Sequence, residues 1–132
     1  MVEGLNGGTI LIVEDEPLIA EALTVALEEA GFSGVATTDA NDAMAILEKN
    51  RARDLAGLVT DINLGGSRNG WEIASRAREM NPGLPVVYMS GDSAADWAAH
   101  GVPHSAVLQK PFALAQVVVA LSSLLNRTHL DD

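Results

Sequence analysis

Cysteine is absent from this 132-residue chain, and basic residues are scarce, with 8 Lys and Arg against 18 Asp and Glu. Without cysteine the chain has no disulfide, no thiolate nucleophile and no Cys-ligated zinc. The net charge of −10 argues against binding to nucleic acid, which needs clustered cations. No apolar run approaches the roughly 18 residues that span a membrane, and residues 1–8 do not resemble a signal peptide. We therefore expect a cytoplasmic protein that binds neither nucleic acid nor membrane.

Five short apolar runs alternate along the chain with segments of helical periodicity. Two of them, Thr9–Val13 and Pro85–Met89, are almost continuously apolar, which is typical of strands buried on both faces of a parallel sheet. The other runs are Gly34–Thr37, Leu58–Thr60 and Ala106–Gln109. Five strand–helix repeats predict an α/β fold, a flavodoxin-like doubly wound (βα)5 domain with a five-stranded parallel sheet in order 2-1-3-4-5.

The predicted helices are bounded by residues that start or stop helices, such as Gly31 after the first and Pro82 after the third. They cover approximately residues 18–30, 39–50, 70–80, 92–100 and 112–125. Neither a repeat nor a linker interrupts this pattern. We expect one domain over residues 9–125, a frayed N-terminus at 1–8 and a C-terminal tail at 126–132.

Polar residues follow four of the five predicted strands, and they are Glu14 and Asp15, Asp61, Ser90 and Lys110. Because the carboxyl ends of parallel strands lie along one edge of the sheet, we expect these side chains to converge. Two carboxylates ~4 Å apart repel by about 4 kcal/mol at an effective dielectric near 20, and one lysine offsets only part of this. A raised pKa or a hard cation can remove the remainder. Oxygen ligands without His or Cys suit Mg²⁺, with Mn²⁺ as the alternative.

This set of residue types is suited to phosphoryl transfer, which requires positioning and charge stabilisation. Asp61 is a candidate carboxylate nucleophile. Asp15 and Asp61 are the candidate direct ligands of the metal, with Glu14 acting through water. Lys110 supplies a positive charge, and the hydroxyl of Ser90 supplies a hydrogen bond.

Four motifs at the strand ends resemble those of the response regulator receiver family of two-component signalling. They are Val13-Glu14-Asp15-Glu16-Pro17, Asp61 with Asn63, Met89-Ser90-Gly91 and Lys110-Pro111-Phe112. The resemblance implies that Asp61 is the phosphoacceptor, Ser90 the switch hydroxyl and Lys110 the phosphoryl-binding lysine. It also implies Mg²⁺ bound by Glu14, Asp15, Asp61 and the backbone carbonyl of Asn63.

The resemblance covers about residues 9–125 and also implies partners. The phosphodonor would be a phosphohistidine on a sensor histidine kinase or on a histidine phosphotransfer protein. Such a domain is not an enzyme for other substrates, because it catalyses only its own phosphorylation and dephosphorylation and signals by protein–protein contact. The face built from the fourth helix, the fifth strand and the fifth helix is the usual signalling surface of the family and could support a homodimer.

Several features depart from the usual family pattern. Val107 stands three positions before the lysine, where most receivers have Tyr or Phe as a second switch residue. In the loop after Asp61, Gly65 replaces the usual proline, and Gly70 falls one position later than the usual glycine, which implies one inserted residue. No output domain follows within the 132 residues.

Other interpretations of single residues and of the whole chain remain open. Asn63 and Asp92 flank the expected access route to the phosphoryl group, where residues influence phosphate loss in this family. Ser90 or Asp92 could instead cap the fourth helix. A degenerate receiver acting as a phosphorylation-independent binding module is one alternative function. Val107 keeps it open, although the presence of all five site residues favours activity. An aspartyl-phosphate hydrolase is another, which Asn63 and the short chain disfavour.

Overall fold

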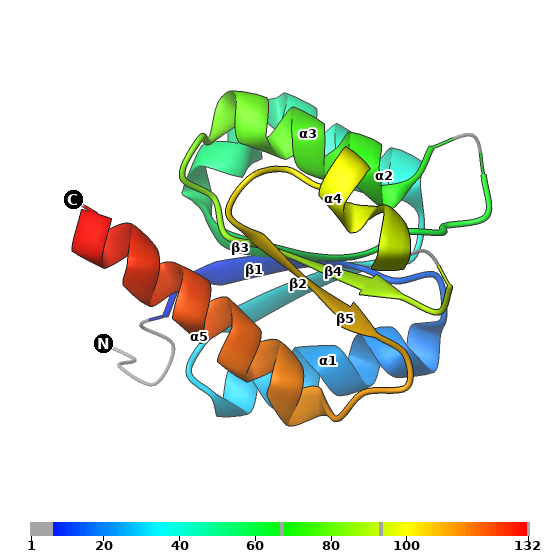
Figure 1. The fold of residues 1–132 in the computed structure, drawn as a ribbon, viewed down its shortest axis with the longest axis horizontal. Helices are drawn as coiled ribbons and strands as arrows, with labels where there is room; N and C mark the ends of the chain where they lie inside the picture. The colour runs from blue at the N-terminus through cyan, green and yellow to red at the C-terminus, as the bar shows by residue number, and fades with distance from the viewer. Residues whose placement is uncertain (1–6, 67, 93, 132) are drawn as a thin grey trace.

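A five-stranded parallel sheet forms the centre of the computed structural model, which describes residues 7–66, 68–92 and 94–131 (Figure 1). The strand order is β2-β1-β3-β4-β5, and all four pairings are parallel. This confirms the predicted flavodoxin-like topology. The strands are β1 (Thr9–Val13), β2 (Ser33–Thr37), β3 (Leu55–Asp61), β4 (Val86–Ser90) and β5 (Ser105–Gln109).

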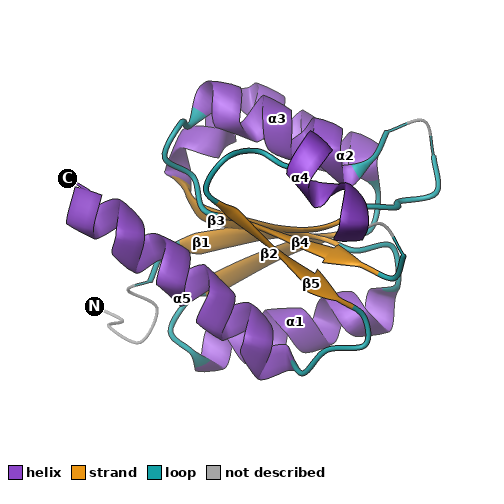
Figure 2. Cartoon of the chain, viewed as in Figure 1, coloured by secondary structure: helices purple, strands orange, loops and turns teal. Residues whose placement is uncertain are grey.

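Helices cover both faces of the sheet, with α1 and α5 on one side and α2, α3 and α4 on the other (Figures 1 and 2). The α-helices are α1 (Pro17–Glu29), α2 (Ala40–Ile46), α3 (Gly70–Met80), α4 (Trp97–His100) and α5 (Leu114–Asp131). A π-helical turn, η2 (Leu47–Arg51), and a 3₁₀ turn, η3 (Ala52–Asp54), continue α2, and a 3₁₀ turn, η4 (Ala94–Asp96), precedes α4.

Several elements differ in length from the sequence prediction. β3 begins at Leu55, three residues before the predicted Leu58. At Gly57 an added Cβ would lie 2.8 Å from the Cδ1 of Leu121, so the small residue allows α5 to pack closely on the strand. The fourth α-helix has only four residues, and none of them is buried. The last helix continues through Asp131, over residues expected to form a tail, while residues 1–6 of the expected frayed N-terminus lie outside the described residues.

Two apolar layers lie on opposite faces of the sheet, because alternate residues of each strand point to opposite sides. Leu11, Leu58 and Tyr88 belong to the layer that contacts α2 and α3. Ile12 and Val87 belong to the layer that contacts α1 and α5. Burial of each large apolar side chain contributes about 1.5–3 kcal/mol, so both layers hold the sheet rigidly beneath its carboxyl edge.

Candidate functional site

The end of β1 places Glu14 inside the protein and Asp15 at the surface. The backbone N–H of Glu14 donates to the carbonyl of Thr37 at 3.0 Å, which extends the β1–β2 ladder by one residue. The Glu14 side chain is fully buried, and its Oε2 accepts a hydrogen bond from the backbone N–H of Glu16 at 3.1 Å. Pro17 then begins α1 at N1, where a missing N–H costs no helical bond. The start of α1 therefore fixes the buried carboxylate.

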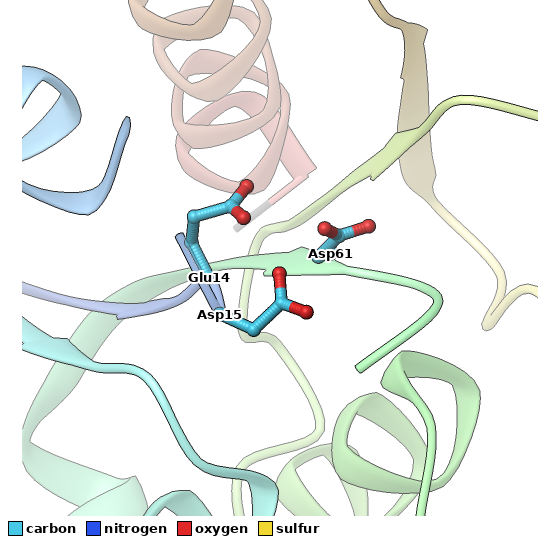
Figure 3. Close-up of side chains that lie close together, drawn as sticks. All are labelled: Glu14, Asp15 and Asp61. Carbon is cyan, nitrogen blue, oxygen red and sulfur yellow. The ribbon is translucent and has the colours of Figure 1, made fainter. Parts of the chain in front are cut away.

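Three carboxyl groups converge at the carboxyl edge of the sheet, as Figure 3 shows for Glu14, Asp15 and Asp61. One oxygen of each lies within 4.8 Å of the others. Glu14 and Asp61 are buried, whereas Asp15 is exposed. In the part of the chain that the structure describes, this is the group of potential ligands dense enough to hold a metal ion. The donor atoms are all oxygens, which fits a hard divalent cation such as Mg²⁺.

Lys110 brings its positive charge from the end of β5 to two of these carboxylates. Its Nζ donates to Oε1 of Glu14 and to Oδ2 of Asp61, both at 2.9 Å. Burial alone would lower the pKa of Lys110, but the hydrogen bonds to Asp61 and Glu14 outweigh burial, and the pKa is raised. Burial raises the pKa of Glu14, although its hydrogen bond from Lys110 acts in the opposite direction. The lysine therefore remains charged, and it binds both buried carboxylates.

The backbone around Asp61 is fixed by β4 and by the start of α3. Ile62 donates its N–H to the carbonyl of Met89 at 3.0 Å and accepts from the N–H of Gly70 at 2.8 Å. An added Cβ on Gly70 would strike the carbonyl oxygen of Asp61, so only glycine permits this approach. Gly70 therefore supports the backbone of Asp61 even though it falls at the ninth position after it.

Polar groups at the end of β4 lie next to those at the end of β3. The carbonyl of Ser90 accepts from the backbone N–H of Lys110 at 2.7 Å, and its buried Oγ accepts from the N–H of Asp92 at 3.2 Å. Asn63 Nδ2 donates to Oδ1 of Asp92 at 2.9 Å, which joins the two residues predicted to flank the access route. The α-helical part of this segment, α4, has Asp96 as its N-cap, and the residue before the 3₁₀ turn η4 lies outside the described residues, so capping by Ser90 or Asp92 stays a prediction.

An aromatic residue missed by sequence reasoning lies beside Val107. Tyr88 on β4 is the Cα partner of Val107 on β5 and is fully buried. Its ring centroid lies 4.7 Å from that of Trp71, and its hydroxyl accepts from the backbone N–H of Val102 at 3.1 Å. The available sequence signal was that the only tyrosine of the chain stands two positions before Ser90, on the same face of the strand.

Comparison with protein families agrees with this geometry. The model of the response regulator receiver domain family matches residues 10–122. The chain belongs to this family. It is thus a receiver domain of the two-component response regulator type, and it shares with other receivers an acidic pocket of the kind that binds Mg²⁺. A receiver is generally not a classical enzyme.

Individual relatives extend the comparison. The receiver is 32% identical over 122 residues to the probable transcriptional regulatory protein TcrX of Mycobacterium tuberculosis, covering 91% of this chain and 50% of that protein. It is 32% identical over 126 residues to the phosphate regulon transcriptional regulatory protein PhoB of Pseudomonas aeruginosa, covering 92% and 53%. The chain thus spans about half the length of these relatives.

Solved structures show the same fold. A crystal structure of a response regulator receiver protein from Sinorhizobium medicae superimposes on this receiver with a TM-score of 0.86 and 39% sequence identity. The match covers 92% of this chain and 96% of the other. Within the described ranges, none of the helices is both long enough and apolar enough to cross a membrane.

Proposed function

We propose that Asp61 is the phosphoacceptor of this receiver and takes a phosphoryl group from a phosphohistidine. The donor would be a sensor histidine kinase or a histidine phosphotransfer protein. The observation that carries the proposal is that Lys110 Nζ bonds both Asp61 and Glu14 beside a third carboxylate, Asp15, at the carboxyl edge of the sheet. This arrangement offers a nucleophile, a fixed positive charge and oxygen ligands in one place.

The reaction follows from the groups that these residues present. A carboxylate oxygen of Asp61 forms the new bond to phosphorus while the N–P bond of the phosphohistidine breaks. The electron pair of that bond returns to the imidazole. Lys110 contributes positive charge beside the phosphoryl oxygens, and Ser90 can donate its hydroxyl to one of them. The product carries about one additional negative charge, which is the signal.

The oxygen-only donor set fits Mg²⁺, or Mn²⁺ as the alternative. We assign its binding to Glu14, Asp15, Asp61 and the backbone carbonyl of Asn63. When bound, the ion would supply positive charge that neutralises the phosphoryl oxygens. A bound cation would also reduce the electrostatic repulsion between these carboxylates, whose oxygens lie within 4.8 Å of one another.

The Asn63–Asp92 hydrogen bond is proposed to control access to the phosphorylated Asp61. It joins the end of β3 to the turn after β4 at 2.9 Å. A water molecule that hydrolyses the acyl phosphate has to pass the side chains at this rim. We therefore assign both residues to the lifetime of the phosphate.

The phosphorylated receiver would signal by protein contact in the cytoplasm. The α4–β5–α5 face is the proposed contact surface, including contact with a second copy of the chain. Trp97 of α4, with 36% of its surface exposed, is a large apolar residue available there. Absence of contact with nucleic acid or membrane remains a prediction from the net charge of −10 and the lack of a long apolar run.

Incubation with acetyl phosphate and Mg²⁺ tests the proposal by mass spectrometry. The wild type should gain the mass of one phosphate, and Asp61→Asn should gain none. Asp54→Asn is a matched control, because Asp54 is an exposed carboxylate in η3, before the start of β3. Its phosphorylation should equal that of the wild type.

The same experiment separates the alternative functions. A degenerate receiver would show no gain of mass, and modification of Asp61→Asn would exclude Asp61 as the acceptor. An aspartyl-phosphate hydrolase would release phosphate from a phosphomonoester over many turnovers. The proposed receiver should not turn over a phosphomonoester catalytically, and at most one phosphate should label each molecule. Chelation of Mg²⁺ with EDTA should abolish acceptance.

A further inference from the structure

Tyr88 connects three elements on the face of the sheet that α3 and α4 cover. Its ring packs against Trp71 at the start of α3, with centroids 4.7 Å apart and planes tilted by 57°. Trp71 in turn lies 5.8 Å from the ring of His100 at the end of α4. The tyrosine hydroxyl accepts the backbone N–H of Val102, in the loop between α4 and β5. Tyr88 thus contacts the helix layer and that loop from the centre of β4.

The position of Tyr88 on β4 relates it to the phosphoryl site. Ser90 lies two residues further along the same strand, so both side chains point to the same face, about 6.6 Å apart along the strand. Ser90 ends β4 at the site, where its carbonyl also binds the N–H of Lys110. Only Met89 separates Tyr88 and Ser90 in the extended strand, so a displacement of Ser90 toward the site would pull on Tyr88.

Several side chains hold the loop after α4, and two of their hydrogen bonds are made to the backbone of Val102. Its N–H is bound by Tyr88, and its carbonyl accepts from the hydroxyl of Ser105 at 2.6 Å. Ser105 Oγ also accepts from the indole Nε1 of Trp97 at 2.9 Å. A continuous series of contacts therefore runs from Tyr88 through Val102 and Ser105 to the exposed Trp97 of α4.

The end of the loop is anchored separately to α3. Arg78 donates to the carbonyls of Pro103 and His104 at 2.6 and 2.9 Å, and to that of Leu84 at 2.6 Å. These three bonds come from one planar guanidinium and hold the loop at the end of the sheet opposite the site. A shift in the loop is therefore expected at Val102, where it contacts β4, and less at residues bound by Arg78.

β5, the strand next to β4, contains no aromatic residue that could act in place of Tyr88. Val107, its Cα partner on β5, is short and branched and packs against the same apolar layer. A valine has neither a ring to move between positions nor a hydroxyl that could bind the loop. Of these two neighbours, Tyr88 alone has a polar atom that reaches the loop between α4 and β5.

We propose that Tyr88 couples the phosphoryl site to the α4–β5–α5 face in this receiver. When Ser90 moves toward a phosphoryl group on Asp61, β4 shifts Tyr88, and its hydroxyl shifts Val102 and then Trp97. Tyr88 is a positioning residue in this scheme, since it acts through Ser90 and does not touch the phosphoryl group. The inference rests on the proposed function of Asp61.

The test is ¹⁵N NMR of the full chain before and after phosphorylation with acetyl phosphate and Mg²⁺. In the wild type, the backbone amide of Val102 and the indole N–H of Trp97 should both change their chemical shifts. Tyr88→Phe keeps the ring and removes the hydroxyl. This variant should accept one phosphate by mass, as the wild type does, yet lose the phosphorylation-dependent shifts at Val102 and Trp97. Because each variant is compared with its own unphosphorylated form, a static change in structure cancels.

Ser105→Ala is the matched control, because it removes a hydroxyl from the same series of contacts but leaves the Tyr88 bond to Val102 intact. Its Val102 amide should still respond to phosphorylation, while its Trp97 indole should not. Full shifts in phosphorylated Tyr88→Phe would overturn the coupling role and leave the proposed function standing. Absence of phosphate on the wild type would overturn both. If Tyr88→Phe does not fold, an unchanged Val102 shift and hydrogen-exchange rate in the phosphorylated wild type overturn the coupling role directly.

Discussion

Replacement of Asp61 by asparagine removes one negative charge from a site where three carboxylates share one lysine. Carboxylate oxygens no more than 4.8 Å apart repel by at least about 3.5 kcal/mol at an effective dielectric of 20, and Asp61 has two such neighbours, Glu14 and Asp15. On the same scale, Lys110 Nζ at 2.9 Å attracts Asp61 by about 5.7 kcal/mol. The repulsion therefore slightly exceeds the attraction, and exposure of Asp15 and of a quarter of Lys110 weakens both.

Because repulsion and attraction at Asp61 nearly cancel, Asp61→Asn should keep its stability although it loses one partner of a buried ion pair. Without Mg²⁺, Asp61→Asn should leave the free energy of unfolding unchanged or raise it by about 1 kcal/mol. Loss of one partner of a buried pair ordinarily costs about 3–5 kcal/mol. With Mg²⁺ at about 100 times its dissociation constant, the wild type should gain about 2.7 kcal/mol, and the variant clearly less.

The assay is urea unfolding at pH 7, followed by circular dichroism, in EDTA and in saturating Mg²⁺. Asp54→Asn again serves as the control and should follow the wild type in both buffers. Destabilisation of Asp61→Asn by more than about 3 kcal/mol in EDTA would refute the view that repulsion dominates the metal-free site. Equal stabilisation of variant and wild type by Mg²⁺ would refute Asp61 as a ligand.

Three further predictions follow from other contacts. Gly70→Ala should lower the free energy of unfolding by about 1–3 kcal/mol in urea, because its Cβ would strike the carbonyl of Asp61, whereas Gly66→Ala, with no neighbour within 4 Å, should not. Asp92→Ala should shorten the half-life of the phosphorylated protein severalfold in a mass-spectrometric time course, since the bond from Asn63 is lost; an unchanged half-life would contradict the access role. Burial raises the pKa of Tyr88, so its hydroxyl ionises at a lower pH in the unfolded chain than in the folded protein. The stability that Tyr88 contributes is therefore complete below about pH 10 and declines above that pH. When unfolding is measured at increasing alkaline pH, Tyr88→Phe should lack this part of the decline in stability.

The sequence predicted the bounds of a strand best where both faces of that strand are buried. β1 was predicted with its exact bounds and β4 within one residue, because β-branched apolar runs of this kind suit only a covered strand. The first three residues of β3 were missed because Ala56 and Gly57 carry little apolar surface, although Leu55 and Gly57 pair with Thr9 and Ile10 of β1. The fourth helix was predicted as one helix from about Asp92 to His100, but Ala94–Asp96 form a 3₁₀ turn and only Trp97–His100 are α-helical, since alanine favours a helix locally but offers little area to bury.

The site could be predicted largely from topology. Strand order alone places the ends of β1, β3 and β5 at one edge, and the structure does bring Glu14, Asp61 and Lys110 together there. Their individual roles in phosphoryl transfer stay predictions. The bond from Asn63 to Asp92 and the contacts of Tyr88 depend on loop geometry and side-chain rotamers, which a single sequence does not specify. A lone tyrosine in an apolar strand looks like an ordinary core residue until its hydroxyl is seen to bind a loop.

The position of Trp71 has a practical consequence. It directly follows Gly70, whose backbone lies against the carbonyl of Asp61, and its ring packs on Tyr88. The chain contains only one other tryptophan, Trp97, so Trp97→Phe would leave Trp71 as the single emitting indole. Because the ring of Trp71 packs on Tyr88, fluorescence of such a protein would test, without a label, whether the proposed metal binding and phosphoryl transfer change the surroundings of Tyr88. Phosphodonors could then be compared by stopped-flow, with the receiver serving as its own optical sensor.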